Sequence, residues 1–300
     1  MSRRTIAAGL VAALLILVLA LTALAVRQGR QALAAESGLR QRLAAVLAAP
    51  ADQIRPCKQV APANALVLLA LGQSNAANHA VADPSAARIP MVSAEGCLWA
   101  GDPLPGGTGR GGSIWSRLPA ALAAQAELQP VVISVLAVDA SSMAEWTQAG
   151  SPLRARLELH LARMAQWGLP PALVLWHQGE AEAMQHTSAE RYRAGLLTLA
   201  GIVQGQVGQV GQVGPVRLLL AHSTICRSAR NEAVHQAIAQ QVASAAPFGT
   251  GPDLDGALAP QDRLDGCHLN AEGLAHAAAL WASAIRVDRA FVTPPLTRPS

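Results

Sequence analysis

The sequence has little of several residue types, and these shortages exclude classes of partner. Of its 300 residues, 3% are aromatic, and Lys58 is the only lysine. The net charge of +4 comes from arginines scattered along the chain, without a basic cluster interleaved with aromatic residues. Nucleic-acid binding needs such a patch to face the phosphates. We therefore expect no nucleic-acid partner.

Cysteines are also few, and none has the spacing of a zinc site. The chain has four, with no Cys-x-x-Cys pair among them. Because structural zinc sites use closely spaced cysteines and histidines, we expect no metal. An even number permits two disulfides in an oxidising compartment, with several connectivities open. The four are Cys57, Cys97, Cys226 and Cys267.

Charge is absent from residues 5–26, which follow Arg3 and Arg4 directly. As a helix this stretch would be about 33 Å long, close to the thickness of a bilayer core. We expect residues 1–26 to form an uncleaved, single-pass signal anchor in the cell (inner) membrane, with the rest of the chain extracytoplasmic (periplasmic). The alternative is a cleaved signal peptide that ends near residues 23–25.

The remaining sequence predicts a stalk, one domain and a tail. Residues 27–56 are rich in Ala, Leu, Arg and Gln and predict a helical linker, followed by a domain at 57–290 and a tail at 291–300. Apolar runs of strand length alternate with helical segments in this domain. Such a pattern predicts an α/β domain with three α/β/α layers and a central parallel sheet. The predicted strands are 65–71, 131–138, 172–176 and 216–221; the predicted helices are 116–127, 152–167, 188–204, 231–245 and 270–285.

The strand at 65–71 runs directly into residues 72–75, Gly-Gln-Ser-Asn. A buried strand that ends in a Gly-flanked serine is typical of α/β hydrolases, where it exposes the nucleophile. Asp265 and His268 stand three residues apart before the last helix. That spacing lets a carboxylate orient an imidazole, which in turn can take the proton of Ser74. The combination predicts a Ser-His-Asp acyl-transfer site.

Two further segments are candidates for the same crevice. Residues 176–180, Trp-His-Gln-Gly-Glu, end a predicted strand, so Gln178 should meet Ser74 at the carboxyl edge of the sheet. An amide there can donate to an oxyanion, a contribution of about 3–4 kcal/mol in comparable sites. The Gly-rich residues 109–113 can offer a backbone N–H to the same oxyanion. The candidate substrate-pocket residues are Gln73, Asn75, Asp139, His177 and Glu180.

The blocks at 72–75, 176–180 and 265–268 resemble those of the SGNH-hydrolase superfamily, and more narrowly its sialate O-acetylesterase-like branch of carbohydrate esterases. The likeness covers residues 57–286. It implies a flavodoxin-like three-layer fold and serine hydrolysis of O-acetyl groups on a carbohydrate, without a metal or organic cofactor. It also assigns roles to matching residues. They are Ser74 as nucleophile, His268 as base, Asp265 as its orienting acid, and Ser74 N–H, Gln178 and Gly112 (or Gly111) as the oxyanion hole.

The resemblance includes the cysteines, but the sequence departs from the family's usual pattern at one segment. Asp139 and Ala140 stand where this branch usually has Gly-Gly. A carboxylate at that position would repel an anionic substrate such as a sialic acid. The disulfides that the resemblance implies are Cys57–Cys97 and Cys226–Cys267.

Two other functions remain open from the sequence. An acetyl or acyl transferase acting on a glycan would use the same triad, because both reactions pass through the same acyl-enzyme. A non-catalytic, membrane-tethered glycan-binding module would share the fold, which does not by itself fix the function.

Overall fold

The computed structural model describes residues 3–82, 85, 87–125, 129–208, 215–244 and 246–292, with the side chains of residues 3–16, 32 and 290–292 outside that description. The chain divides into two compact units, Met1–Ala44 and Ala45–Ser300.

The first unit is one helix, α1 (Arg3–Ala44). It takes in the predicted anchor and most of the predicted stalk without a break. Over the residues that the structure describes, no helix has an apolar stretch long enough to span a membrane. The predicted anchor at 5–26 includes residues 5–16, whose side chains lie outside the described residues. The predicted membrane span is therefore not confirmed.

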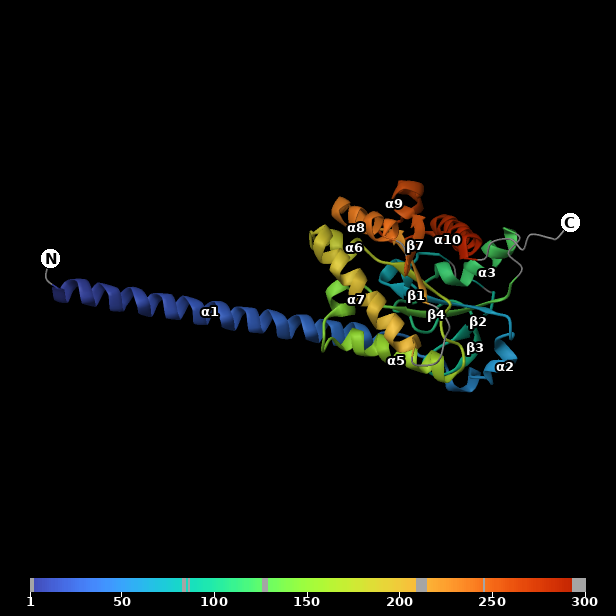
Figure 1. Ribbon diagram of the computed structural model, residues 1–300, viewed down its shortest axis with the longest axis horizontal. Coiled ribbons are helices and arrows are strands. Elements are labelled where there is room, and N and C mark those ends of the chain that lie inside the picture. The colour runs from blue at the N-terminus through green and yellow to red at the C-terminus, as the bar shows by residue number, and fades with distance from the viewer. Residues whose placement is uncertain are drawn as a thin grey trace. The chain divides into compact units, whose positions relative to one another are not determined.

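The second unit is built on a seven-stranded sheet with the order β3-β2-β4-β1-β5-β6-β7 (Figure 1). Neighbouring strands are parallel except for β2 and β3, which are antiparallel. The predicted α/β fold is confirmed, but the sheet that was predicted to be parallel has one antiparallel edge strand, β3. The strands are β1 (Leu66–Gly72), β2 (Ile89–Val92), β3 (Cys97–Ala100), β4 (Val131–Ala137), β5 (Leu173–His177), β6 (Arg217–His222) and β7 (Phe248–Asp253).

Helices cover both faces of this sheet, so the unit has three layers. On one face, α3 (Ile114–Ala124) and α10 (Ala271–Val292) lie side by side (Figure 1). On the other face, α7 (Ala189–Gly208) packs against both α5 (Pro152–Gln166) and α8 (Glu232–Ala243). The short helices are α2 (Cys57–Val60), α4 (Met143–Thr147), α6 (Glu180–Met184) and α9 (Leu254–Ala257), with 3-10 turns η1 (Ala51–Gln53), η2 (Ser74–Ala76) and η3 (Pro260–Asp262).

The central strands divide their side chains between the two layers. Every residue of β1 and β4 is buried. In β4, Ile133 belongs to the apolar core shared with α3 and α10, whereas the adjacent Ser134 points to the other layer and lies 2.8 Å from His160 Nε2 of α5. Because burying each large apolar side chain contributes about 1.5–3 kcal/mol, these strands form a firm base for the residues at their carboxyl ends.

The limits of the domain differ from those predicted. Leu47 N donates to Gly107 O over 3.1 Å, and Gly106 N donates to Leu47 O over 2.8 Å. These bonds tie residues before 57 into the second unit, which begins at Ala45. At the other end α10 continues to Val292, and residues 293–300 of the predicted tail lie outside the described residues. Both disulfides that the resemblance implies are present, Cys57–Cys97 and Cys226–Cys267.

Candidate active site

Ser74 begins the turn η2 at the carboxyl end of β1 and is 2% exposed. The approach of β1 to β5 at this point requires a glycine. Gly72 has φ +151°, and a Cβ there would lie 1.9 Å from His177 O. The backbone N–H of Ser74 donates no hydrogen bond to any described residue. The turn therefore leaves both the hydroxyl and the N–H of Ser74 available for chemistry.

Asp265 and His268 form a hydrogen-bonded pair in the loop before α10. His268 Nδ1 lies 2.8 Å from Asp265 Oδ2, and Asp265 Oδ1 accepts the backbone N–H of His268 at 2.7 Å and of Cys267 at 3.0 Å. Burial alone would raise the pKa of Asp265, but these hydrogen bonds outweigh it and lower the pKa to about 2. The carboxylate is thus charged near neutral pH and holds the Nδ1 proton, which leaves a lone pair on His268 Nε2.

A hydrogen bond connects the serine turn to this loop. Asn75, the residue after Ser74, donates from Nδ2 to Cys267 O at 3.1 Å. The Cys226–Cys267 disulfide holds the same loop from its other side. Among the described residues no hydrogen bond joins Ser74 to His268 directly, and such contacts often shorten only when substrate is bound. The structure therefore brings the three predicted triad residues to one edge of the sheet.

A buried ion pair contacts the loop that carries Asp265 and His268. Arg263 Nη1 donates to Cys267 O at 3.1 Å, and its Nη2 lies 3.6 Å from Asp255 Oδ1. Asp255 also accepts hydrogen bonds from Thr224 and His235 at 2.7 and 2.8 Å. Burial raises the pKa of Asp255, but these hydrogen bonds lower it further, so the net shift is downward. Arg263 thereby holds the backbone of the loop.

Gln178 does not have the freedom that its predicted oxyanion role requires. Its side chain is 0% exposed. Its Nε2 donates to Ser141 O at 3.1 Å and to Glu182 Oε1 at 3.0 Å, while its Oε1 accepts from Tyr192 Oη at 3.1 Å. Both amide protons are therefore used. An oxyanion would have to replace one of these partners.

The N–H groups of the predicted glycine donors also have partners already. The N–H groups of Gly111 and Gly112 donate to backbone carbonyls of residues 78–80, at 2.7 and 3.2 Å. Gly109, by contrast, makes no hydrogen bond through its N–H to any described residue. It has φ +84°, and a Cβ there would lie 2.7 Å from His79 Cδ2, so the backbone passes close to that ring. Gly109 is therefore the better candidate for the backbone donor.

Four of the five predicted pocket residues are buried. They are at most 4% exposed. Glu180 Oε1 accepts from Asn75 Nδ2 at 2.8 Å and from Ser223 Oγ at 2.9 Å, and its burial raises the pKa of this carboxyl. The four are Gln73, Asn75, His177 and Glu180.

His177 and Gln73 show how this buried layer is connected. His177 Nε2 lies 3.0 Å from Ser223 Oγ, and burial lowers the pKa of His177 to about 3, so the ring is neutral. Gln73 Oε1 accepts the backbone N–H of Ala181 at 3.0 Å, which ties the serine turn to α6. These hydrogen bonds hold the turn that carries Ser74.

Asp139 is the fifth predicted pocket residue, and it does lie beside His268, the candidate base. It is half-buried, like His79, which the sequence reading did not single out. The rings of His79 and His268 stack with centroids 5.7 Å apart. Burial lowers the pKa of His79, and Asp139 partly opposes that shift. The signal for His79 in the sequence is its position five residues after Ser74, where the chain leaves the nucleophile turn.

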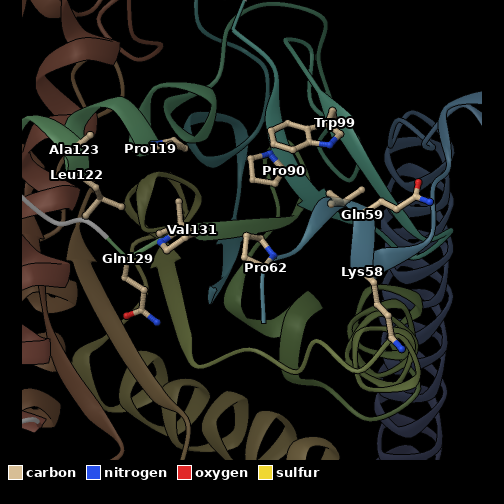
Figure 2. A pocket seen from close by; sticks show the side chains of 12 residues that line it. Lys58, Gln59, Pro62, Pro90, Trp99, Pro119, Leu122, Ala123, Gln129 and Val131 are labelled. Carbon is tan, nitrogen blue, oxygen red and sulfur yellow. The ribbon is translucent and has the colours of Figure 1, made fainter. Parts of the chain in front are cut away.

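Two hollows lie at opposite ends of the sheet. One, of about 730 Å³, is lined by His79, Val81, Arg110 and Ala271, and its His79 stacks on His268. The other, of about 460 Å³, lies by Val131 at the start of β4 and is walled by prolines and Trp99 (Figure 2). Because the triad residues follow the carboxyl ends of the strands, the first hollow is the candidate substrate site.

Comparison with known proteins identifies a family. A family model described as carbohydrate esterase, sialic acid-specific acetylesterase matches residues 113–286, which include Asp265 and His268 and leave Ser74 outside. No curated protein matches the chain.

Several solved structures are similar to this chain at low identity. A protein from Arabidopsis thaliana is 18% identical with a TM-score of 0.59, covering 76% of this chain and 99% of that one. A carbohydrate acetylesterase from Sinorhizobium meliloti is 16% identical, covering 74% and 99%, with a TM-score of 0.45. A family 3 carbohydrate esterase from Clostridium thermocellum is 12% identical, covering 76% and 100%, with a TM-score of 0.46.

Proposed function

The chain belongs to the carbohydrate esterase family of sialic acid-specific acetylesterases, and from this premise we propose that it removes O-acetyl groups from a carbohydrate through an acyl-enzyme on Ser74. One observation carries the proposal. The hydrogen-bonded Asp265–His268 pair stands in a loop that is joined by a hydrogen bond to Asn75, the residue after Ser74.

The mechanism follows from the roles of these groups. Ser74 Oγ attacks the acetyl carbon while His268 Nε2 takes its proton, and the Asp265 carboxylate stabilises the imidazolium. The N–H groups of Ser74 and Gly109 donate to the oxyanion. His268 then gives the proton to the leaving sugar oxygen. In the second half His268 activates a water, which attacks the acetyl-enzyme, releases acetate and restores Ser74.

The experiment is hydrolysis of p-nitrophenyl acetate by the full chain and by its Ser74→Ala variant. We expect a loss of at least about 10³-fold in kcat/KM, because the acyl-enzyme cannot form. Ser283→Ala is the matched control, since Ser283 lies on α10 with its hydroxyl bonded to Gln125. Unchanged activity in Ser74→Ala would refute the proposal. Acetylation of an added sugar in place of acetate release would identify a transferase.

We propose further that the substrate is uncharged near its ester. The carboxylate of Asp139 lies within 4.8 Å of a ring nitrogen of His268, where the ester must approach. At about 8 Å and an effective dielectric of about 20–40, a second negative charge costs about 1–2 kcal/mol. Asp139→Asn should therefore raise the rate on O-acetylated sialic acid, relative to a neutral acetylated sugar, by about 5- to 30-fold.

The control for this specificity is Arg110→Gln, because Arg110 lines the same hollow and carries the opposite charge. In Arg110→Gln the rate on O-acetylated sialic acid, relative to the rate on the neutral acetylated sugar, should fall. An unchanged ratio in Asp139→Asn would show that this carboxylate does not select the substrate.

We also propose that the domain works outside the cytoplasm. Its two disulfides support this location, because such bonds persist in oxidising compartments. Tethering to the membrane rests on the uncharged sequence of residues 5–26. Protease treatment of intact and opened cells tests the location. Protection of the domain in spheroplasts would contradict the extracytoplasmic location.

A further inference from the structure

Three side chains that are typical metal ligands converge above the active site. His79 follows the serine turn, Asp139 follows β4, and His268 precedes α10. One nitrogen or carboxylate oxygen from each lies within 4.8 Å of the other two. All three residues are half-buried, so a cation from solvent can reach them.

The donor types suit zinc. Two imidazoles and one carboxylate are a common zinc ligand set, with a fourth position left for water. Tetrahedral zinc with bonds of about 2.0–2.2 Å holds its donors about 3.3 Å apart. The three atoms must therefore approach one another by about 1.5 Å at most. Changes in side-chain torsion can supply this movement without moving the backbone.

Neighbouring groups already orient these ligands. A histidine that binds zinc usually donates its other ring N–H to a carboxylate. Asp265 Oδ2 lies 2.8 Å from His268 Nδ1, which leaves Nε2 for a metal. Thr108 Oγ1 lies 3.0 Å from His79 Nε2 and accepts the backbone N–H of Asp139 at 2.9 Å. Thr108 therefore holds the other two ligands near each other.

We propose that His79, Asp139 and His268 form a zinc-binding site and that zinc bound there inhibits the esterase. Zinc would occupy the lone pair of His268 Nε2, which the reaction needs to accept the proton of Ser74. Binding of zinc goes beyond the proposed function, whereas its inhibitory effect rests on that function.

Binding is tested by calorimetric titration of zinc chloride into the full chain carrying Ser74→Ala, without a histidine tag. We expect one zinc per chain. Adding His79→Gln or Asp139→Asn should weaken the Kd at least about 10-fold, because each removes a ligand. The control is His222→Gln, since His222 and His235 form a separate pair with Nδ1 atoms 3.3 Å apart. No binding at millimolar zinc, an unchanged Kd in His79→Gln, or loss of binding in His222→Gln would overturn the site.

Inhibition is tested on the wild-type chain with p-nitrophenyl acetate, after subtraction of zinc-catalysed hydrolysis without protein. We expect zinc to inhibit and EDTA to restore the rate. In His79→Gln the inhibitory concentration, measured against that variant's own zinc-free rate, should rise at least about 10-fold. Activity that persists at saturating zinc would refute the inhibitory role. Zinc binding by a chain without esterase activity would instead refute the proposed function and leave the site standing.

Discussion

Replacement of Asp255 by asparagine should destabilise the fold through the ion pair beneath the catalytic loop. The side chain of Asp255 is 0% exposed and that of Arg263 is 4% exposed. Asp255 Oδ2 accepts two hydrogen bonds from Thr224 at 2.7 Å, and Oδ1 accepts one from Ile225 N at 3.1 Å. In either orientation the NH₂ group of the introduced asparagine would face one of these donors.

The size of the effect follows from these contacts. A buried donor left without an acceptor costs about 1–3 kcal/mol, and a buried charge that loses its partner costs about 3–5 kcal/mol. Because the asparagine oxygen retains part of the network, we expect a total loss of about 3–5 kcal/mol for Asp255→Asn. For a domain of this size that lowers Tm by about 6–20 °C.

The assay is guanidinium unfolding followed by the fluorescence of the buried tryptophans, with Asp52→Asn on η1 as an exposed control. Arg263→Met and the double variant complete a mutant cycle. The coupling between Asp255 and Arg263 should be about 1–3 kcal/mol, because the double variant no longer leaves an unpaired buried guanidinium. A loss below about 1 kcal/mol in Asp255→Asn, or strict additivity in the cycle, would refute this reasoning.

Two smaller effects on stability follow from the same loops. Ala140 is exposed and has φ +49°, a conformation that costs an L-residue about 1–2 kcal/mol. Ala140→Gly removes this cost but adds conformational entropy to the unfolded chain, so we expect Tm to rise by about 1–4 °C. A lower Tm would contradict this prediction. The pKa of Asp265 is lowered to about 2 in the folded chain, so its contribution to stability is complete above the unfolded pKa and is lost as pH falls from about 4 to 2. The Tm difference between wild type and Asp265→Asn should therefore shrink as the pH falls below about 4, and a difference that grows there would show the opposite sign.

The sequence predicted those parts of the fold that rest on continuous apolar runs. The strands at β1, β4, β5 and β6 lie within a residue or two of their predicted limits. In contrast, β7 has the sequence Phe-Gly-Thr-Gly-Pro-Asp, which reads as a turn. Its pairing with β6 becomes evident only once the sheet has formed. The antiparallel β2 and β3 are four residues each, too short for an alternating pattern to stand out.

In the candidate site, too, the roles that depend on residues close in the sequence could be predicted, whereas those that depend on residues distant in the sequence could not. Asp265 and His268 share one loop, so their pairing could be predicted from a spacing of three residues. Whether the Gln178 amide is free to bind an oxyanion depends on its hydrogen bonds to Tyr192, fourteen positions later on α7, and to Glu182 of α6. Similarly, Gly112 loses its donor to Ala80, which belongs to a separate segment. A motif supplies the residue type at the edge of the sheet, but which donors stay unpaired is decided by tertiary hydrogen bonds. For that reason Gly109, whose N–H no described neighbour takes, is a stronger candidate than the glycine that the motif indicates.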